Sequence, residues 1–112
     1  MKQLGWIPNG TDFPIEKIFP LHTFYASVFR KDDKGIPTAG FQIENSLTRE
    51  EALRSITIWA AKASFEENEK GSLEPGKMAD FVILDKDLMT SPPEDVLKTI
   101  IESVYIAGEK VY

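Results

Sequence analysis

The sequence contains no cysteine and only one histidine, His22. Without cysteine the chain forms no disulfide, no thiolate nucleophile and no cysteine-ligated metal site. No stretch approaches the roughly 20 apolar residues that span a bilayer, and residues 1–6 lack the apolar run of a signal peptide. These absences predict a soluble, cytoplasmic protein with no membrane partner.

Positive charge is also scarce, because 13 Lys and Arg stand against 18 Asp and Glu, a formal net charge of -5. Nucleic acids and anionic membranes are bound through basic patches. The pair Arg30 and Lys31 is followed directly by Asp32 and Asp33, which neutralise it. We therefore expect no nucleic-acid partner, and a nucleic-acid-binding regulator is the least favoured functional class.

The 112 residues suit one domain of modest size. Residues 5–13 begin apolar and run into Pro8, Asn and Gly, which predicts a brief strand or extended segment ending in a turn. Residues 20–30 place apolar side chains at helical spacing behind Pro20, which suits a first-turn position. Residues 31–46 carry Asp, Gly and Pro without periodicity and predict a long surface loop.

A capping-box pattern begins the helix that the sequence supports best. The Thr48 hydroxyl can accept from the backbone of Glu51, whose side chain can reach back to Thr48. One apolar stripe follows it, made of Ala52, Leu53, Ile56, Trp59, Ala60 and Ala63. The pattern predicts a single helix that frays near residues 68–71.

The rest of the chain predicts strands and turns. Residues 73–77 form a turn through their Pro-Gly pair, and residues 79–85 hold a continuous apolar run typical of a buried strand. Residues 94–98 could begin a short helix, and residues 100–112 carry hairpin chemistry with Gly108 in the tight turn. The residues by themselves therefore indicate an α+β domain.

Asp80 and Asp85 bracket the predicted buried strand. A paired-carboxylate site is conceivable there. Solubilising residues at the strand ends are the favoured interpretation, because charged side chains commonly protect strand edges.

Residues 71–85 read Gly-Ser-Leu-Glu-Pro-Gly-Lys-Met-Ala-Asp-Phe-Val-Ile-Leu-Asp. This run closely resembles the C-terminal signature of amidohydrolases. More narrowly, it is similar to the YtcJ-like group, metal-dependent hydrolases acting on non-peptide C–N bonds. Gly-Thr-Asp-Phe-Pro at residues 10–14 and the segments 25–30, 40–42 and 47–53 match that group in the same order. The resemblance therefore covers nearly the whole chain.

The resemblance implies a place within a larger architecture. Residues 1–68 would be the last strand and helices of a (β/α)8 barrel, and residues 69–112 the C-terminal strands of its small β-sandwich domain. A whole barrel takes about 250 residues, more than this chain has. The resemblance further implies a small-molecule substrate and a divalent metal, most simply zinc, in the intact enzyme. Because the family's histidine ligands are missing, we expect this chain alone to be inactive and to hold no metal.

Asp12 is the candidate catalytic residue. It follows a short apolar segment, and catalytic groups of barrels lie at the C-terminal ends of strands. By resemblance, Asp12 is the acid of the last strand, which touches the metal and handles the proton of the metal-bound water. The alternative is a turn residue whose side chain bonds nearby amides. For the isolated chain that alternative is favoured, since catalytic metal sites use about three protein ligands.

His22 and Arg30 are weaker candidates. His22 matches no ligand histidine of the group and is best interpreted as a helix or loop residue near a pocket rim. Arg30 matches a recurrent arginine of the group and could pair with Asp12, Asp32 or a substrate carboxylate. A helix-end cation that complements the helix dipole is the commoner role.

A structural or oligomerisation module is the alternative function. The strands near Phe81 and Ile106 would lack their N-terminal partners and leave edges open to pairing. The apolar stripe behind Thr48 would likewise lose its barrel neighbours. This interpretation predicts a homo-oligomer, a dimer or larger, with no catalytic role.

Overall fold

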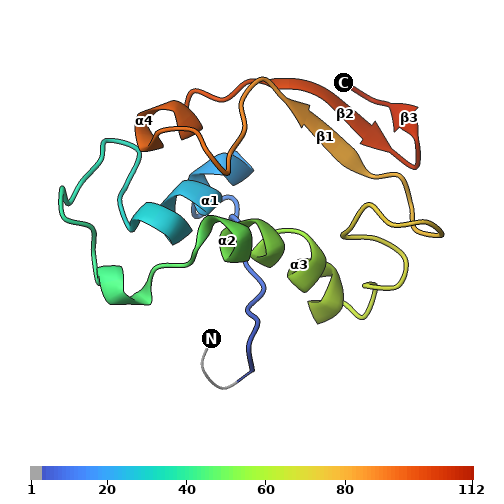
Figure 1. Cartoon of the computed structure of the whole chain (residues 1–112), viewed down its shortest axis with the longest axis horizontal. Coiled ribbons are helices and arrows are strands. Elements are labelled where there is room, and N and C mark those ends of the chain that lie inside the picture. Colours follow the sequence, from blue (N-terminus) through green and yellow to red (C-terminus); the bar gives the residue numbers. More distant parts are fainter. Residues whose placement is uncertain (1–3) are drawn as a thin grey trace.

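The computed structural model describes residues 4–112, so the first three residues of the predicted 1–68 unit lie outside the described residues. The predicted α+β class is confirmed. Figure 1 shows the helices gathered on one side and a small sheet on the other. In chain order the elements are α1 Pro20–Phe29, η1 Ile43–Asn45, α2 Arg49–Ser55, α3 Ile58–Ala63, β1 Phe81–Leu84, α4 Pro93–Val96, β2 Ile101–Ile106 and β3 Glu109–Lys110.

Helix α1 forms where the apolar spacing predicted it. Pro20 occupies the first turn, where its missing N–H is not needed. The helix ends at Arg30, which adopts a left-handed φ of 55° and donates its backbone N–H to the Ala26 carbonyl at 3.0 Å. This fixes the direction in which the following loop leaves the helix.

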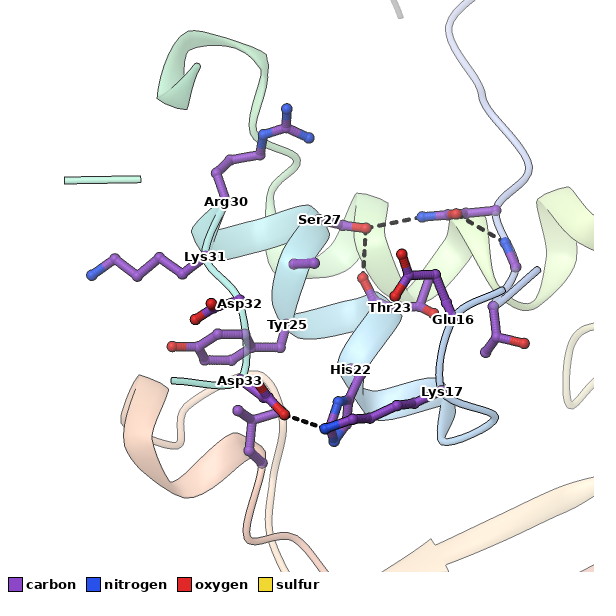
Figure 2. A pocket seen from close by; sticks show the side chains of 15 residues that line it. Glu16, Lys17, His22, Thr23, Tyr25, Ser27, Arg30, Lys31, Asp32 and Asp33 are labelled. Carbon is purple, nitrogen blue, oxygen red and sulfur yellow. Dashed lines mark hydrogen bonds and ion pairs between the residues drawn. The ribbon is translucent and has the colours of Figure 1, made fainter. Parts of the chain in front are cut away.

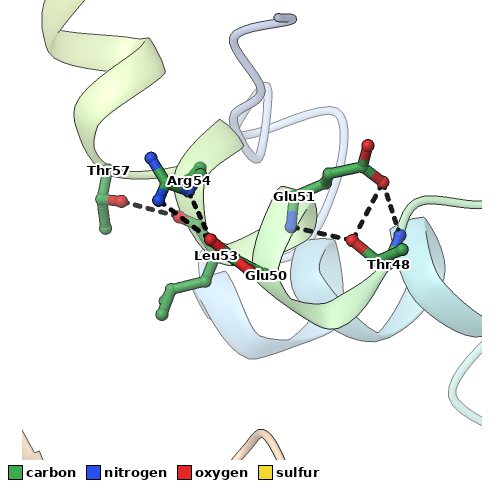
Figure 3. Close-up of polar contacts among 6 residues, drawn as sticks. All are labelled: Thr48, Glu50, Glu51, Leu53, Arg54 and Thr57. Atoms are coloured by element: carbon green, nitrogen blue, oxygen red, sulfur yellow. Dashed lines mark hydrogen bonds and ion pairs between the residues drawn. The ribbon is translucent and has the colours of Figure 1, made fainter.

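The predicted capping box of α2 is confirmed (Figure 3). The Glu51 amide donates to Thr48 Oγ1 at 3.2 Å, and the Thr48 amide donates to Glu51 Oε2 at 2.8 Å. Arg54 and Glu50 add an ion pair of 2.9 Å one turn apart. Backbone donors that an N-terminus leaves open are thus satisfied locally.

The prediction of one continuous helix after the capping box is wrong. The structure divides it at Thr57, whose φ of -125° and ψ of -100° are not helical. The Thr57 hydroxyl donates to the Leu53 carbonyl at 2.7 Å (Figure 3), a side-chain bond that competes with helical pairing. Helix α3 then ends at Ala63, before the predicted residues 68–71, and Phe65 turns the chain with a φ of 62°.

The three strands form an antiparallel sheet in the order β1-β2-β3. Phe81 lies opposite Tyr105, and their rings stack with centroids 4.5 Å apart. The predicted hairpin is confirmed, with Ala107 and Gly108 at φ of 52° and 82° in its turn. Two successive positive φ values are typical of a turn whose twist matches that of the strands.

Residues 79–85 contain the predicted strand, but the prediction that this strand is buried is wrong. The strand is Phe81–Leu84, and Val82 and Ile83 are 50% and 41% exposed. Because β1 lies at the edge of the sheet, it has a strand on one side only. An apolar run is consistent with a buried strand, but whether the strand is buried depends on which elements the fold packs against it.

The core joins the helices to the C-terminal segment. Its buried side chains are Leu21, Phe24, Tyr25, Ala52, Leu88 and Val96. Residues on both sides of position 68 therefore share one core. Arg49 strengthens this junction by donating from Nη1 to the Leu88 carbonyl at 2.6 Å. The opposite side of α1 is left free to line a pocket.

The remaining segments are irregular. Residues 5–13 form no strand among the described residues, and the segment runs into a turn that begins at Asp12. The Asn9 amide donates to the Ser55 carbonyl at 2.9 Å. The predicted turn at residues 73–77 is confirmed, with Gly76 at a φ of 92°. No helix formed by residues 4–112 is long and apolar enough to cross a bilayer.

Candidate functional site

A pocket of about 430 Å³ lies between three segments of the chain, and Leu97 completes its lining. Residues 9–17 form one wall, α1 forms the floor, and residues 30–33 form the other wall (Figure 2). Residues on both sides of Asp12, the position that the sequence singled out, line the pocket, whereas Asp12 itself does not.

Two side chains hold the wall before Asp12 against α1. Asn9 Nδ2 donates to Ser27 Oγ at 2.9 Å, and Ser27 Oγ donates to the Thr23 carbonyl at 2.7 Å (Figure 2). Asn9 and Ser27 are 18 positions apart. Sequence inspection places Asn9 in a turn and gives no signal for this contact.

Asp12 lies in an exposed turn at the edge of the pocket, next to the lining residue Thr11. Its φ of 50° is left-handed, a conformation that Asp tolerates better than most residues. Its carbonyl accepts from the amides of Ile15 at 2.9 Å and Glu16 at 3.4 Å. The turn is therefore closed by the Asp12 backbone, and its carboxylate has no hydrogen-bond partner among residues 4–112.

An ion pair joins the two walls of the pocket. Lys17 from the first wall bonds the Asp33 carboxylate of the other wall (Figure 2). The hydrogen bond and the charge of Lys17 lower the pKa of Asp33 below its usual value, and His22 adds a smaller effect. His22 lies in the first turn of α1 and lines the pocket, as expected for a rim residue.

Arg30 holds the second wall in place. Its Nε donates to the Phe41 carbonyl at 2.9 Å, and the Phe41 amide donates to the Arg30 carbonyl at 2.7 Å. These two bonds close the base of loop 31–46. Among the described residues, Arg30 forms an ion pair with neither Asp12 nor Asp32, which the sequence had offered as partners.

Asp80 and Asp85 do not form a paired-carboxylate site. Asp80 accepts from the Ala107 amide at 2.8 Å, and Asp85 accepts from the Ile100 amide at 2.6 Å. The two are five residue steps apart along extended chain, which corresponds to roughly 16 Å. Hydrogen bonding from Lys86 and then from the Ile100 amide lowers the pKa of Asp85. Both carboxylates fasten β1 to the end of the hairpin or to the start of β2.

The part of the chain that the structure describes holds no group of three or more His, Cys, Asp or Glu side chains placed to bind a metal. The unbonded carboxylate of Asp12 suits one ligand position, since carboxylate oxygens bind zinc and other divalent metals. Further ligands would have to come from outside residues 4–112.

The sequence profile described as the amidohydrolase family matches residues 1–112. The chain is 35% identical over 107 residues to Protein LONG AFTER FAR-RED 3 of Arabidopsis thaliana, covering 92% of this chain and 17% of that protein. It is 30% identical over 99 residues to the N-substituted formamide deformylase of Arthrobacter pascens, covering 88% of this chain and 18% of that enzyme.

Two further similarities agree with these. The chain is 28% identical over 104 residues to the amidohydrolase YtcJ of Bacillus subtilis strain 168, covering 93% of this chain and 20% of that protein. The crystal structure of an amidohydrolase from Thermotoga maritima MSB8 superposes with a TM-score of 0.52 at 31% identity, over 62% of this chain and 17% of that one. The chain thus spans about a fifth of the length of the curated relatives it matches.

Proposed function

The chain belongs to the amidohydrolase family, and from this premise we propose that it is the C-terminal portion of a metal-dependent hydrolase acting on non-peptide C–N bonds. The match of the family profile to residues 1–112 carries the proposal. The name of the Arthrobacter pascens relative, an N-substituted formamide deformylase, supports a small amide as substrate.

The proposal assigns residues 1–68 to the end of the barrel and residues 69–112 to the small β domain. The likeness to the Thermotoga maritima amidohydrolase supports a place within such an enzyme. In the intact enzyme a divalent metal, most simply zinc, would lower the pKa of a bound water molecule so that it can lose a proton near neutral pH. Residues 4–112 hold no group of three or more side chains placed to bind such a metal, and we therefore propose that the chain is inactive by itself.

Asp12 is the proposed catalytic residue. Its carboxylate is exposed beside the pocket and has no hydrogen-bond partner among the described residues. In the proposed reaction it takes a proton from the attacking water and delivers it to the leaving nitrogen.

A chimera tests this proposal. The corresponding C-terminal part of the Arthrobacter pascens deformylase would be replaced by residues 1–112, and release of formate from an N-substituted formamide would be measured. We expect Asp12→Asn to lower kcat at least about 100-fold, as loss of a general acid–base does, while the exposed Glu44→Gln leaves it unchanged. A chimera in which Asp12→Asn hydrolyses as fast as its parent would contradict the role of Asp12.

The exposed edge of β1 favours a second candidate function, a structural module that assembles with copies of itself. Val82 and Ile83 expose apolar surface on a strand that is paired on one side only among residues 4–112, and such edges invite pairing. This candidate predicts a dimer or larger oligomer of the chain. Light scattering during size-exclusion chromatography would decide it, and a monomer at every concentration would exclude it.

A further inference from the structure

Among the described residues, one carboxylate that lines the pocket has no hydrogen-bond or ion-pair partner. Three carboxylates line it, Glu16, Asp32 and Asp33. Asp33 is bonded by Lys17, and Asp32 Oδ1 accepts from the amides of Lys34 at 2.9 Å and Ile36 at 2.8 Å. Within residues 4–112 the Glu16 carboxylate has no such partner, and Figure 2 shows it free above α1.

The position of Glu16 is set by the same turn that presents Asp12. The Glu16 amide donates to the Asp12 carbonyl at 3.4 Å, which places the two residues at opposite ends of one closed turn. Glu16 lines the pocket, whereas Asp12 lies at its edge. The turn therefore carries two carboxylates that have different surroundings and so can have different tasks.

The cations of the pocket do not neutralise Glu16. Lys17 is the next residue, but its ammonium bonds Asp33 on the other wall. Figure 2 shows the side chains of Arg30 and Lys31 extending away from Glu16. A carboxylate is an acceptor only, and it bonds N–H groups most strongly when charge assists the bond. The ligand group that suits the Glu16 carboxylate is therefore an N–H donor, above all an ammonium group.

We propose that Glu16 binds the nitrogen side of the substrate and makes the pocket selective for amines and for amides that carry an N–H. Hydrolysis of a C–N bond turns an amide nitrogen into an amine, which is protonated at neutral pH. A carboxylate at this place would accept from the amide N–H at first and pair with the ammonium product afterwards. This assignment rests on the proposed hydrolase function and adds the group that recognises the leaving nitrogen.

A ligand titration of the 112-residue chain tests the assignment without turnover or metal. n-Butylammonium and the uncharged 1-butanol would be titrated at constant pH, and the imidazole resonances of His22 would be followed by NMR. His22 lines the pocket and is the sole histidine, so it gives one reporter signal. We expect the ammonium to bind about threefold more tightly than the alcohol, a ratio typical of an exposed ion pair.

The variants Glu16→Gln and Glu16→Ala should both remove this preference, because each removes the charge of an exposed side chain. Glu44→Gln is the matched control, since Glu44 is exposed and does not line the pocket. Equal binding of the two ligands by the wild-type chain would overturn the assignment, and so would a preference that survives in both variants. The two proposals can fail separately. An inactive Asp12→Asn chimera together with equal binding of the two ligands by the wild-type chain would support the hydrolase function and overturn the role of Glu16.

Discussion

Gly71 provides the most direct test of how the connection to the sheet packs on the helices. Its φ is +90°, and a Cβ added there would lie 2.7 Å from the Ala61 Cβ and 3.0 Å from the Ile58 Cα. Gly76 has nearly the same φ, +92°, but nothing lies within 4 Å of its added Cβ. The two glycines therefore differ in packing and agree in backbone conformation.

Gly71→Ala combines two costs. A left-handed conformation costs an L-residue about 1–2 kcal/mol, and forcing a methyl group into filled space costs about 1–3 kcal/mol. We expect a loss of roughly 2–5 kcal/mol in the free energy of unfolding. Gly76→Ala should lose only the backbone part, about 1–2 kcal/mol. At about 4–8 °C per kcal/mol for a domain of this size, the two melting temperatures should be clearly separated.

Urea unfolding followed by circular dichroism measures both variants, with the slope of the transition checked for constancy. Gly71→Ala should cost less in an Ala61→Gly background than in the wild type, because Ala61→Gly removes the nearest contact of the added methyl group. Ala61→Gly alone, which costs about 1 kcal/mol in a helix, is the reference for that comparison. Equal losses for Gly71→Ala and Gly76→Ala would refute the close packing of this turn against α3.

Two further substitutions test a helix cap and a charged contact at the end of β1. Thr48→Ala should lower the free energy of unfolding by about 1 kcal/mol by removing the helix cap, and an unchanged urea midpoint would contradict the capping box. Asp85→Asn keeps an acceptor for the Ile100 amide but removes the charge beside Lys86. Because the folded-state pKa of Asp85 is lowered, its contribution is present above the unfolded pKa of about 3.9 and is lost as pH falls through the folded value. The variant should therefore be less stable than the wild type at pH 7, with the gap in urea midpoint closing below about pH 4; a gap constant with pH would contradict this.

Part of the candidate site could be predicted from the sequence and part could not. The place of His22 in the pocket lining agrees with the expected position at a rim, whereas the catalytic role of Asp12, which the resemblance implies, stays a prediction. Glu16 and Lys17 gave no signal, because charged residues in irregular segments are normally solvated. Asp33 was expected to neutralise Arg30 and Lys31, but among the described residues its ion pair is with Lys17. Their proximity depends on the path of loop 31–46, which local patterns do not specify.

The sequence by itself determined the local elements whose causes lie within a few residues. The Thr48 capping box, the start of α1 at Pro20 and the hairpin turn at Gly108 all formed as predicted, because short-range hydrogen bonds and backbone preferences fix them. The family resemblance likewise required only the order of residues.

Tertiary structure alone decided the break at Thr57, the exposure of Val82 and Ile83, and the ion pair between Lys17 and Asp33. An apolar stripe continues through Thr57 without signalling that the chain turns there. An apolar strand has the same sequence whether or not another element covers it. Two charged side chains that are 16 positions apart meet only when a helix and a loop return the chain to the same place.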